Sequence, residues 1–173
     1  MKVIFWSPFP NKAAEQNIQR VAESCRWEFG IQVRVLHNYK KALLRLNPHL
    51  EARWDMVFID CGSNWDYCVE ELLRKGETAV INLPREENLL TEYFLTHHTI
   101  PGNILYLFNG SHRYPKVNKR KLEKIYRLQK ENVAVLSIPV QETGTDRSSH
   151  GRNLWKESGR EAAWKLLKMN CFF

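Results

Sequence analysis

Six short and nearly uninterrupted apolar runs alternate with longer amphipathic segments along the chain, and this alternation restricts the fold more than any other feature. Runs such as VIF, MVFI, ILYLF and VAVLSI are typical of strands buried on both faces of a sheet. The amphipathic segments between them are long enough to serve as helical crossover connections. The alternation therefore predicts an α/β protein: a three-layer α/β/α, Rossmann-like fold with a mostly parallel sheet of about six strands.

The positions of the runs give the expected elements. Strands are expected at residues 3–7, 33–37, 56–60, 79–83, 104–108 and 133–138. Helices are expected at residues 13–29, 39–46, 67–74, 87–97, 119–129 and 157–169. The polar stretch 141–153 is predicted to be irregular, and because no linker divides the chain, residues 1–173 are expected to form a single domain.

Composition limits the compartment and the partners. The chain has no apolar run of the ~18 residues that a membrane span needs and no signal-peptide pattern, so a cytoplasmic protein without a transmembrane segment is expected. Its four cysteines form no CxxC pair, which favours reduced thiols. The formal net charge of +7 allows attraction to nucleic acid or to an anionic membrane surface but does not require it.

Two basic segments of the chain are candidates for binding a polyanion or a membrane surface. Cations gather after the fifth expected strand, where they form either a solvated helix face or a polyanion-binding patch; they are Lys116, Lys119, Arg120, Lys121, Lys124 and Arg127. The C-terminal segment SGREAAWKLLKMNCFF is basic and amphipathic. It is expected to dock on the sheet, and a peripheral helix at a membrane surface is the alternative.

Ligands of parallel α/β sheets bind beyond the carboxyl ends of the strands, so polar residues at those ends are the candidate site. Asp60 ends the run MVFI, where a carboxylate can hold a magnesium-bound water, accept a phosphoryl group or simply cap the following turn. Asn109 ends the run ILYLF, and Asn109–Gly110 either reads a nucleotide base or forms a turn.

Several stretches, in order along nearly the whole chain, resemble the deviant-Walker-A ATPases of the ParA/MinD type, which are SIMIBI-class P-loop proteins. They are VIFWSP with its loop and helix, WDMVFIDCGSN, AVINLPREENLLTEYF, NILYLFNGSHRYPKVNKRKLEKIYRL and VAVLSIPVQETGTD. The resemblance implies that Asp60 positions magnesium and water, and that the nucleotide base lies near Asn109. It also implies a cytoplasmic bacterial protein that works in positioning or partitioning, with a protein partner or as a homodimer.

The phosphate loop departs from that family's pattern Gly-x-x-Gly-x-Lys-(Thr or Ser), which by register falls on Asn11, Ala14, Gln16 and Asn17. The first two positions carry side chains where the backbone must approach phosphate closely. The last two supply neither the lysine nor the metal-binding hydroxyl, and Lys12 is the one cation of this loop.

We therefore expect a degenerate nucleotide site and a pseudo-ATPase that acts as a scaffold or localisation partner. No catalytic residue and no cofactor are expected, ATP or ADP with magnesium binds weakly if at all, and Asp60 is the metal ligand if magnesium is retained. A weakly nucleotide-binding ATPase of the same family is one alternative. A receiver-like signalling module with Asp60 as phosphoacceptor is another, and strand order separates it, because a receiver pairs its second strand directly with its first.

Overall fold

A six-stranded sheet forms the centre of the protein, and all of its strand pairs are parallel. The computed structural model describes residues 1–9, 12–37, 53–66, 78–84, 86–97, 103–111, 119–138 and 149–171. The strands are β1 (Lys2–Trp6), β2 (Val33–His37), β3 (Met56–Asp60), β4 (Thr78–Leu83), β5 (Asn103–Ser111) and β6 (Val133–Ile138). Each strand expected from an apolar run is present, which confirms the α/β fold class.

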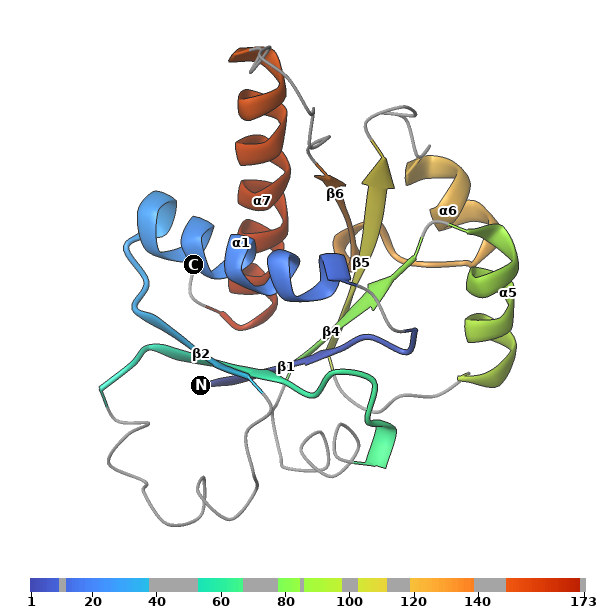
Figure 1. The fold of residues 1–173 in the computed structure, drawn as a ribbon, viewed down its shortest axis with the longest axis horizontal. Helices are drawn as coiled ribbons and strands as arrows, with labels where there is room; N and C mark the ends of the chain where they lie inside the picture. The colour runs from blue at the N-terminus through green and yellow to red at the C-terminus, as the bar shows by residue number, and fades with distance from the viewer. Residues whose placement is uncertain are drawn as a thin grey trace.

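Helices cover both faces of this sheet, as Figure 1 shows. They are α1 (Lys12–Phe29), α5 (Glu87–Thr96), α6 (Lys119–Ile125) and α7 (Ser149–Met169), with a short 3-10 turn at Lys130–Asn132. Two separate apolar clusters fill the interfaces. One joins α1 and α7 to the sheet through residues such as Phe5, Ile18 and Leu166, and the other joins α5 and α6 to it through Trp6, Tyr93 and Leu122. The arrangement is the predicted three-layer α/β/α sandwich.

The strand order is β2-β3-β1-β4-β5-β6. β3 is inserted between β1 and β2, so Asp60 at its end pairs in register with both Phe5 and His37. This is the order expected for the P-loop class, and it differs from the 2-1-3-4-5 order of a receiver. The chain turns toward β2 after β1 and crosses to β4 after β3, which places the reversal of strand order between β1 and β4.

Two helix boundaries predicted from sequence are wrong. The helix expected at 119–129 ends at Ile125, because Arg127 adopts a left-handed conformation (φ 53°) and the N–H of Leu128 donates to the carbonyl of Glu123. The helix expected at 157–169 begins at Ser149 instead, so residues 149–153 are helical rather than irregular. Extending an existing helix costs little once its core-facing turns are formed, and the polar composition of this stretch does not prevent it.

Strand pairing excludes the turn predicted as one alternative for Asn109–Gly110. β5 continues through both residues, which pair with Leu136 and Ser137 of β6, so this dipeptide does not form a turn. The expected helices at 39–46 and 67–74 lie outside the described residues.

The C-terminal helix docks on the body of the protein, as predicted. α7 buries Ala162, Ala163, Leu166 and Leu167 completely and packs beside α1 over the sheet (Figure 1). Among the helices in the described parts of the chain, none is both long and apolar enough to cross a membrane.

Candidate functional site

Polar side chains from four elements meet beneath the first half of α1, next to the reversal of strand order. Asn82 and Asn109 stand at the carboxyl ends of β4 and β5, Asp60 ends β3, and Asn17 comes from α1. The neighbouring sheet residues on this side, Val80 and Leu107 among them, belong to the apolar cluster under α1 and α7. Alternation along the strands therefore turns these polar side chains toward α1.

The three asparagines form one buried group. Their exposed fractions are 2% for Asn17, 2% for Asn82 and 4% for Asn109. The Asn17 amide nitrogen donates to the side-chain oxygen of Asn82 at 3.3 Å and to that of Asn109. The amide nitrogens of Asn82 and Asn109 have no hydrogen-bond partner among the described residues. The hydrogen bonds of this group connect α1 to β4 and β5, and the amide nitrogens of Asn82 and Asn109 remain as two donors without a described partner.

A second group surrounds Asp60. One carboxylate oxygen accepts from the backbone N–H of Gly62 at 2.9 Å, and the other lies 3.1 Å from Nδ1 of His37. Because an ionised carboxylate only accepts hydrogen bonds, Nδ1 of His37 carries the proton that is donated. The Nε2 of the neutral ring then accepts from the Gln19 amide at 2.8 Å. Asp60 thus caps its own turn and anchors α1 to β2 through His37.

The loops after β1 and β3 are joined through the backbone. The N–H of Ser7 donates to the carbonyl of Gly62 at 2.8 Å, and the N–H of Cys61 donates to the carbonyl of Phe5 at 2.9 Å. Gly62 has φ +55°, a conformation that side chains rarely adopt. This turn is the reason that the Asp60 carboxylate reaches a backbone N–H two residues ahead.

The described residues of the degenerate phosphate loop differ in their surroundings. Asn17 faces the strand ends, Ala14 is buried, and Gln16 is exposed. Lys12 is the first residue of α1, and Asn11 lies outside the described residues. Sequence reasoning missed Gln19 and His37; His37 follows an apolar run as Asp60 does, but only the strand order makes them neighbours.

A metal centre of protein ligands is not present in the described parts of the chain, where no group of three or more His, Cys, Asp or Glu side chains could hold an ion. The cysteines there, Cys25, Cys61 and Cys171, are free thiols. Burial raises the pKa of Cys25 to about 12, more than the nearby Arg26 lowers it, so this thiol stays protonated and unreactive.

The cations of the basic segment differ in burial. Lys119 forms an ion pair with Glu161 of α7, and Lys165 lies 3.4 Å from the same carboxylate. Burial opposes the charge of Lys119, but Glu161 outweighs it and raises the lysine's pKa. Burial, reinforced by the Lys119 ammonium, lowers the pKa of Lys165 to about 8. Exposed cations remain at Arg120, Lys121, Lys124 and Arg127, and Lys116 lies outside the described residues.

The fold defines an α/β protein with an all-parallel sheet in the order β2-β3-β1-β4-β5-β6. Among solved structures it is similar to the crystal structure of a ParA family ATPase from Chlorobium tepidum TLS. The two match with a TM-score of 0.51 over 99% of this chain and 99% of that chain, at 11% sequence identity. Identity this low shows the shared fold alone. No family model matches the chain, and no curated protein matches it in sequence.

Proposed function

We propose that this chain is a divergent ParA/MinD-like protein that does not hydrolyse ATP efficiently and serves as a scaffold or localisation partner. The parallel sheet with its ParA-family structural neighbour supports the relationship. In this proposal the protein works in the cytoplasm through a protein partner or a second copy of itself. Its relatives, by the resemblance of its motifs, position or partition cellular components.

The observation that carries the proposal is the engagement of Asn17 and Asp60 by neighbouring protein groups. By the register of the phosphate-loop pattern, Asn17 falls where the ATPases place a metal-binding hydroxyl. Its amide nitrogen instead donates to Asn82 and Asn109, which crosslinks the helix to the sheet without nucleotide. These two hydrogen bonds fix the Asn17 side chain against the strand ends, and its amide nitrogen cannot ligate magnesium, which binds oxygen.

Asp60 is already held by protein donors. Its two carboxylate oxygens accept from Gly62 and His37, so a metal ion or its water at that carboxylate is limited to the remaining lone pairs. The glycines that would let the backbone approach a phosphate are absent from residues 7–17. The side chains present therefore do not match magnesium-ATP, and no hydrolytic step is assigned to them.

Isothermal titration calorimetry tests this proposal directly. Titration of the full chain with Mg-ATP and with Mg-ADP is expected to give no saturable heat, and neither nucleotide is expected to raise Tm. Micromolar binding of either nucleotide overturns the pseudo-ATPase proposal. Repeating any positive titration with Asp60→Asn identifies whether the magnesium function of Asp60 is retained.

The receiver-like alternative needs a separate experiment on the same carboxylate. Incubation with acetyl phosphate and magnesium, followed by intact-mass measurement, is expected to add no phosphoryl group. A mass increase of one phosphoryl group that is absent from Asp60→Asn would favour the receiver function, in spite of the strand order β2-β3-β1.

A further inference from the structure

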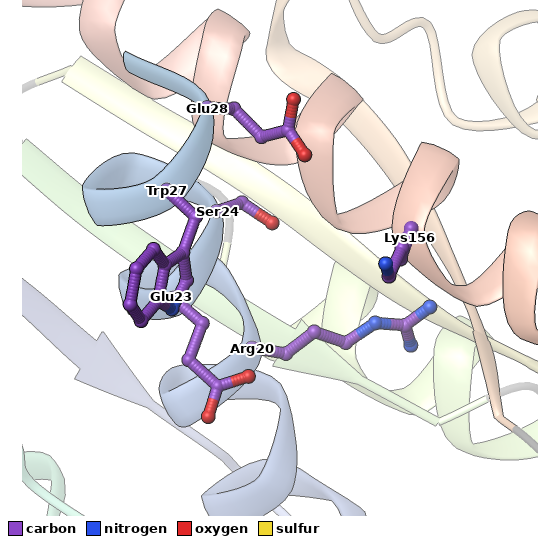
Figure 2. A pocket seen from close by; sticks show the side chains of 6 residues that line it. All are labelled: Arg20, Glu23, Ser24, Trp27, Glu28 and Lys156. Carbon is purple, nitrogen blue, oxygen red and sulfur yellow. The ribbon is translucent and has the colours of Figure 1, made fainter. Parts of the chain in front are cut away.

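The C-terminal half of α1 exposes a large aromatic side chain beside a carboxylate. Trp27 is 84% exposed, whereas an indole in a folded protein is highly buried on average. Glu23 lies one helical turn earlier, so the two side chains share a face of α1 (Figure 2). The Glu28 carboxylate points instead toward α7. Within residues 13–29 the exposed charged side chains are all carboxylates, at Glu15, Glu23 and Glu28.

α7 carries mainly the opposite charge on its exposed face. Within residues 156–169 the exposed side chains are Lys156, Glu157, Arg160, Trp164 and Lys168. All of them except Glu157 follow one another at intervals of one helical turn. Trp164 is 44% exposed, and its ring lies 5.9 Å from that of Phe29 on α1. α7 therefore presents an indole among cations, whereas α1 presents an indole beside carboxylates.

These two faces are neighbours, because α1 and α7 pack beside each other on the same side of the sheet (Figure 1). The helices touch at Gly159, where a Cβ would lie 2.8 Å from the Ser24 hydroxyl. Glu23 and Arg160, the residues next to this contact in sequence, therefore stand at the same level on the two helices. A groove of about 450 Å³ lies between the helices, lined in part by Glu23, Trp27 and Lys156 (Figure 2).

From this arrangement we infer that the α1–α7 surface binds a second copy of this chain, with α1 of each copy against α7 of the other. A twofold axis along the groove exchanges the two helices, so each contact forms twice. Glu23 and Trp27 of one copy then meet the exposed face of the other copy's α7 around Arg160. A guanidinium stacks favourably on an indole and pairs with a carboxylate, and α1 offers both groups one turn apart.

Charge complementarity selects a second copy over other occupants. A polyanion attracted to the cations of α7 meets the carboxylates of α1 beside them, whereas a second copy matches both faces at once. Tryptophan and arginine are also the residues most enriched among the hot spots of protein interfaces. None of these residues belongs to the strand-end groups, so the inference goes beyond the proposed function and does not depend on nucleotide binding.

The exposed aromatic area suits an interface of modest affinity. At 84% exposure, the Trp27 side chains of two copies offer roughly 250–400 Å². A stable interface buries about 1,200–2,000 Å² in total, so the flanking helix faces have to supply most of the area. We therefore expect a dimer with a micromolar Kd that weakens as salt screens the charged contacts.

Sedimentation velocity of the full chain without nucleotide tests this dimer. A reversible monomer–dimer equilibrium is expected across micromolar protein concentrations. Trp27→Ser is expected to weaken dimerisation at least about tenfold, because it removes the central aromatic contact twice. Trp27 is exposed, so the fold tolerates this replacement.

Charge reversal gives a sharper test, because each copy contributes both faces. Glu23→Lys and Arg160→Glu are each expected to weaken dimerisation at least about tenfold, since each variant alone places like charges at both contacts. An equimolar mixture of the two variants is expected to dimerise again, because both contacts of the mixed dimer join opposite charges. Glu92→Lys, at an exposed position of α5 on the other face of the sheet, is the control and is expected to dimerise as the wild type does.

A wild-type chain that stays monomeric throughout this concentration range overturns the inference, whether or not it binds vesicles that contain phosphatidylglycerol. A dimer that Glu23→Lys, Arg160→Glu and Glu92→Lys affect equally also overturns it, as does a mixture of the first two variants that stays monomeric. All samples lack nucleotide, so these outcomes are independent of the nucleotide titrations that test the proposed function.

Discussion

The hydrogen bonds between the buried amides of Asn17, Asn82 and Asn109 contribute to the stability of the fold. A buried amide that loses its partner keeps the full cost of desolvation, whereas a satisfied one contributes modestly. Asn17 satisfies two acceptors at once, one on β4 and one on β5. The link between the start of α1 and the ends of β4 and β5 therefore depends on the Asn17 side chain.

Replacing this side chain tests that dependence. Asn17→Ala leaves the side-chain oxygens of Asn82 and Asn109 without their donor and is expected to lower the free energy of unfolding by about 2–3 kcal/mol. Gln16→Ala, at the exposed neighbouring position, is expected to change it by less than about 0.5 kcal/mol. Urea unfolding measures both variants. Equal effects of the two substitutions would show that the buried amide group is energetically neutral.

Lys165 gives the protein a pH dependence whose sign follows from its surroundings. Burial and the Lys119 ammonium lower its pKa to about 8 in the folded protein, against 10.5 for the ordinary side chain. Below about pH 8 both states carry the proton, and the folded state bears the cost of a desolvated ammonium. Between about 8 and 10.5 only the unfolded state is protonated at this group, so its contribution to stability rises with pH.

The comparison of wild type with Lys165→Met isolates this contribution. From pH 7.5 to pH 10 the unfolding free energy of the wild type is expected to rise relative to the variant by on the order of 1 kcal/mol. Chemical unfolding across that pH range is the measurement. Two stability curves that run parallel would show that Lys165 titrates alike in the folded and unfolded states.

At the scale of elements, Gly159 lies where α7 approaches α1 closely. Gly159 is buried, and the space that a Cβ would need is already occupied by the Ser24 hydroxyl and the Arg20 side chain. In an isolated helix, alanine is preferred to glycine by about 1 kcal/mol. Glycine at this position therefore reflects the close approach of two helices, which outweighs helix propensity.

A double-mutant cycle measures this close approach. Gly159→Ala is expected to destabilise the protein by about 1–2 kcal/mol, because the new methyl group overpacks the interface. In a Ser24→Ala background the loss is expected to shrink by about 1 kcal/mol, since the nearest atom has been removed. Additive effects in urea unfolding would contradict a direct contact between these positions.

Strand positions were predictable from the sequence because burial on both faces leaves a continuous apolar run. β3 and β6 occupy the residues expected for them. β2 does so too, although it is a partly buried edge strand that contains Arg34. The helix ends were less predictable: α6 ends early at a left-handed arginine, and α7 begins eight residues before its expected start at Glu157. These ends depend on backbone hydrogen bonds and on helix extension, which leave no apolar pattern.

At the scale of the whole molecule, the strand order decides which polar residues can act together. Inserting β3 between β1 and β2 makes Asp60 and His37 neighbours and places both under α1 with Gln19. The result is a sheet whose candidate nucleotide region is crosslinked to its covering helix by protein groups. If the proposed function is correct, self-association should not depend on nucleotide, and we expect any dimer to form constitutively or with a partner.

Light scattering coupled to size-exclusion chromatography tests this expectation. The molar mass of the full chain is expected to be the same with magnesium alone, with Mg-ADP and with Mg-ATP. The magnesium sample is the control for ionic effects on this basic protein. A mass that doubles only with Mg-ATP would restore a nucleotide switch and would contradict the proposed function.

The sequence by itself determined the layers and the candidate strand-end residues, because burial on both faces of a sheet and the ends of apolar runs are local properties. Asp60 and Asn109 could be named as strand-end residues without knowing their neighbours. The tertiary structure alone decided that Asp60 pairs with His37, that Asn17 joins Asn82 and Asn109, and that α1 and α7 enclose a charged pocket. The His37–Asp60 contact joins residues 23 positions apart in the chain, and the Arg20–Ser158 contact between α1 and α7 joins residues 138 positions apart. Strand order and helix docking bring such residues together, and no local sequence pattern encodes either of them.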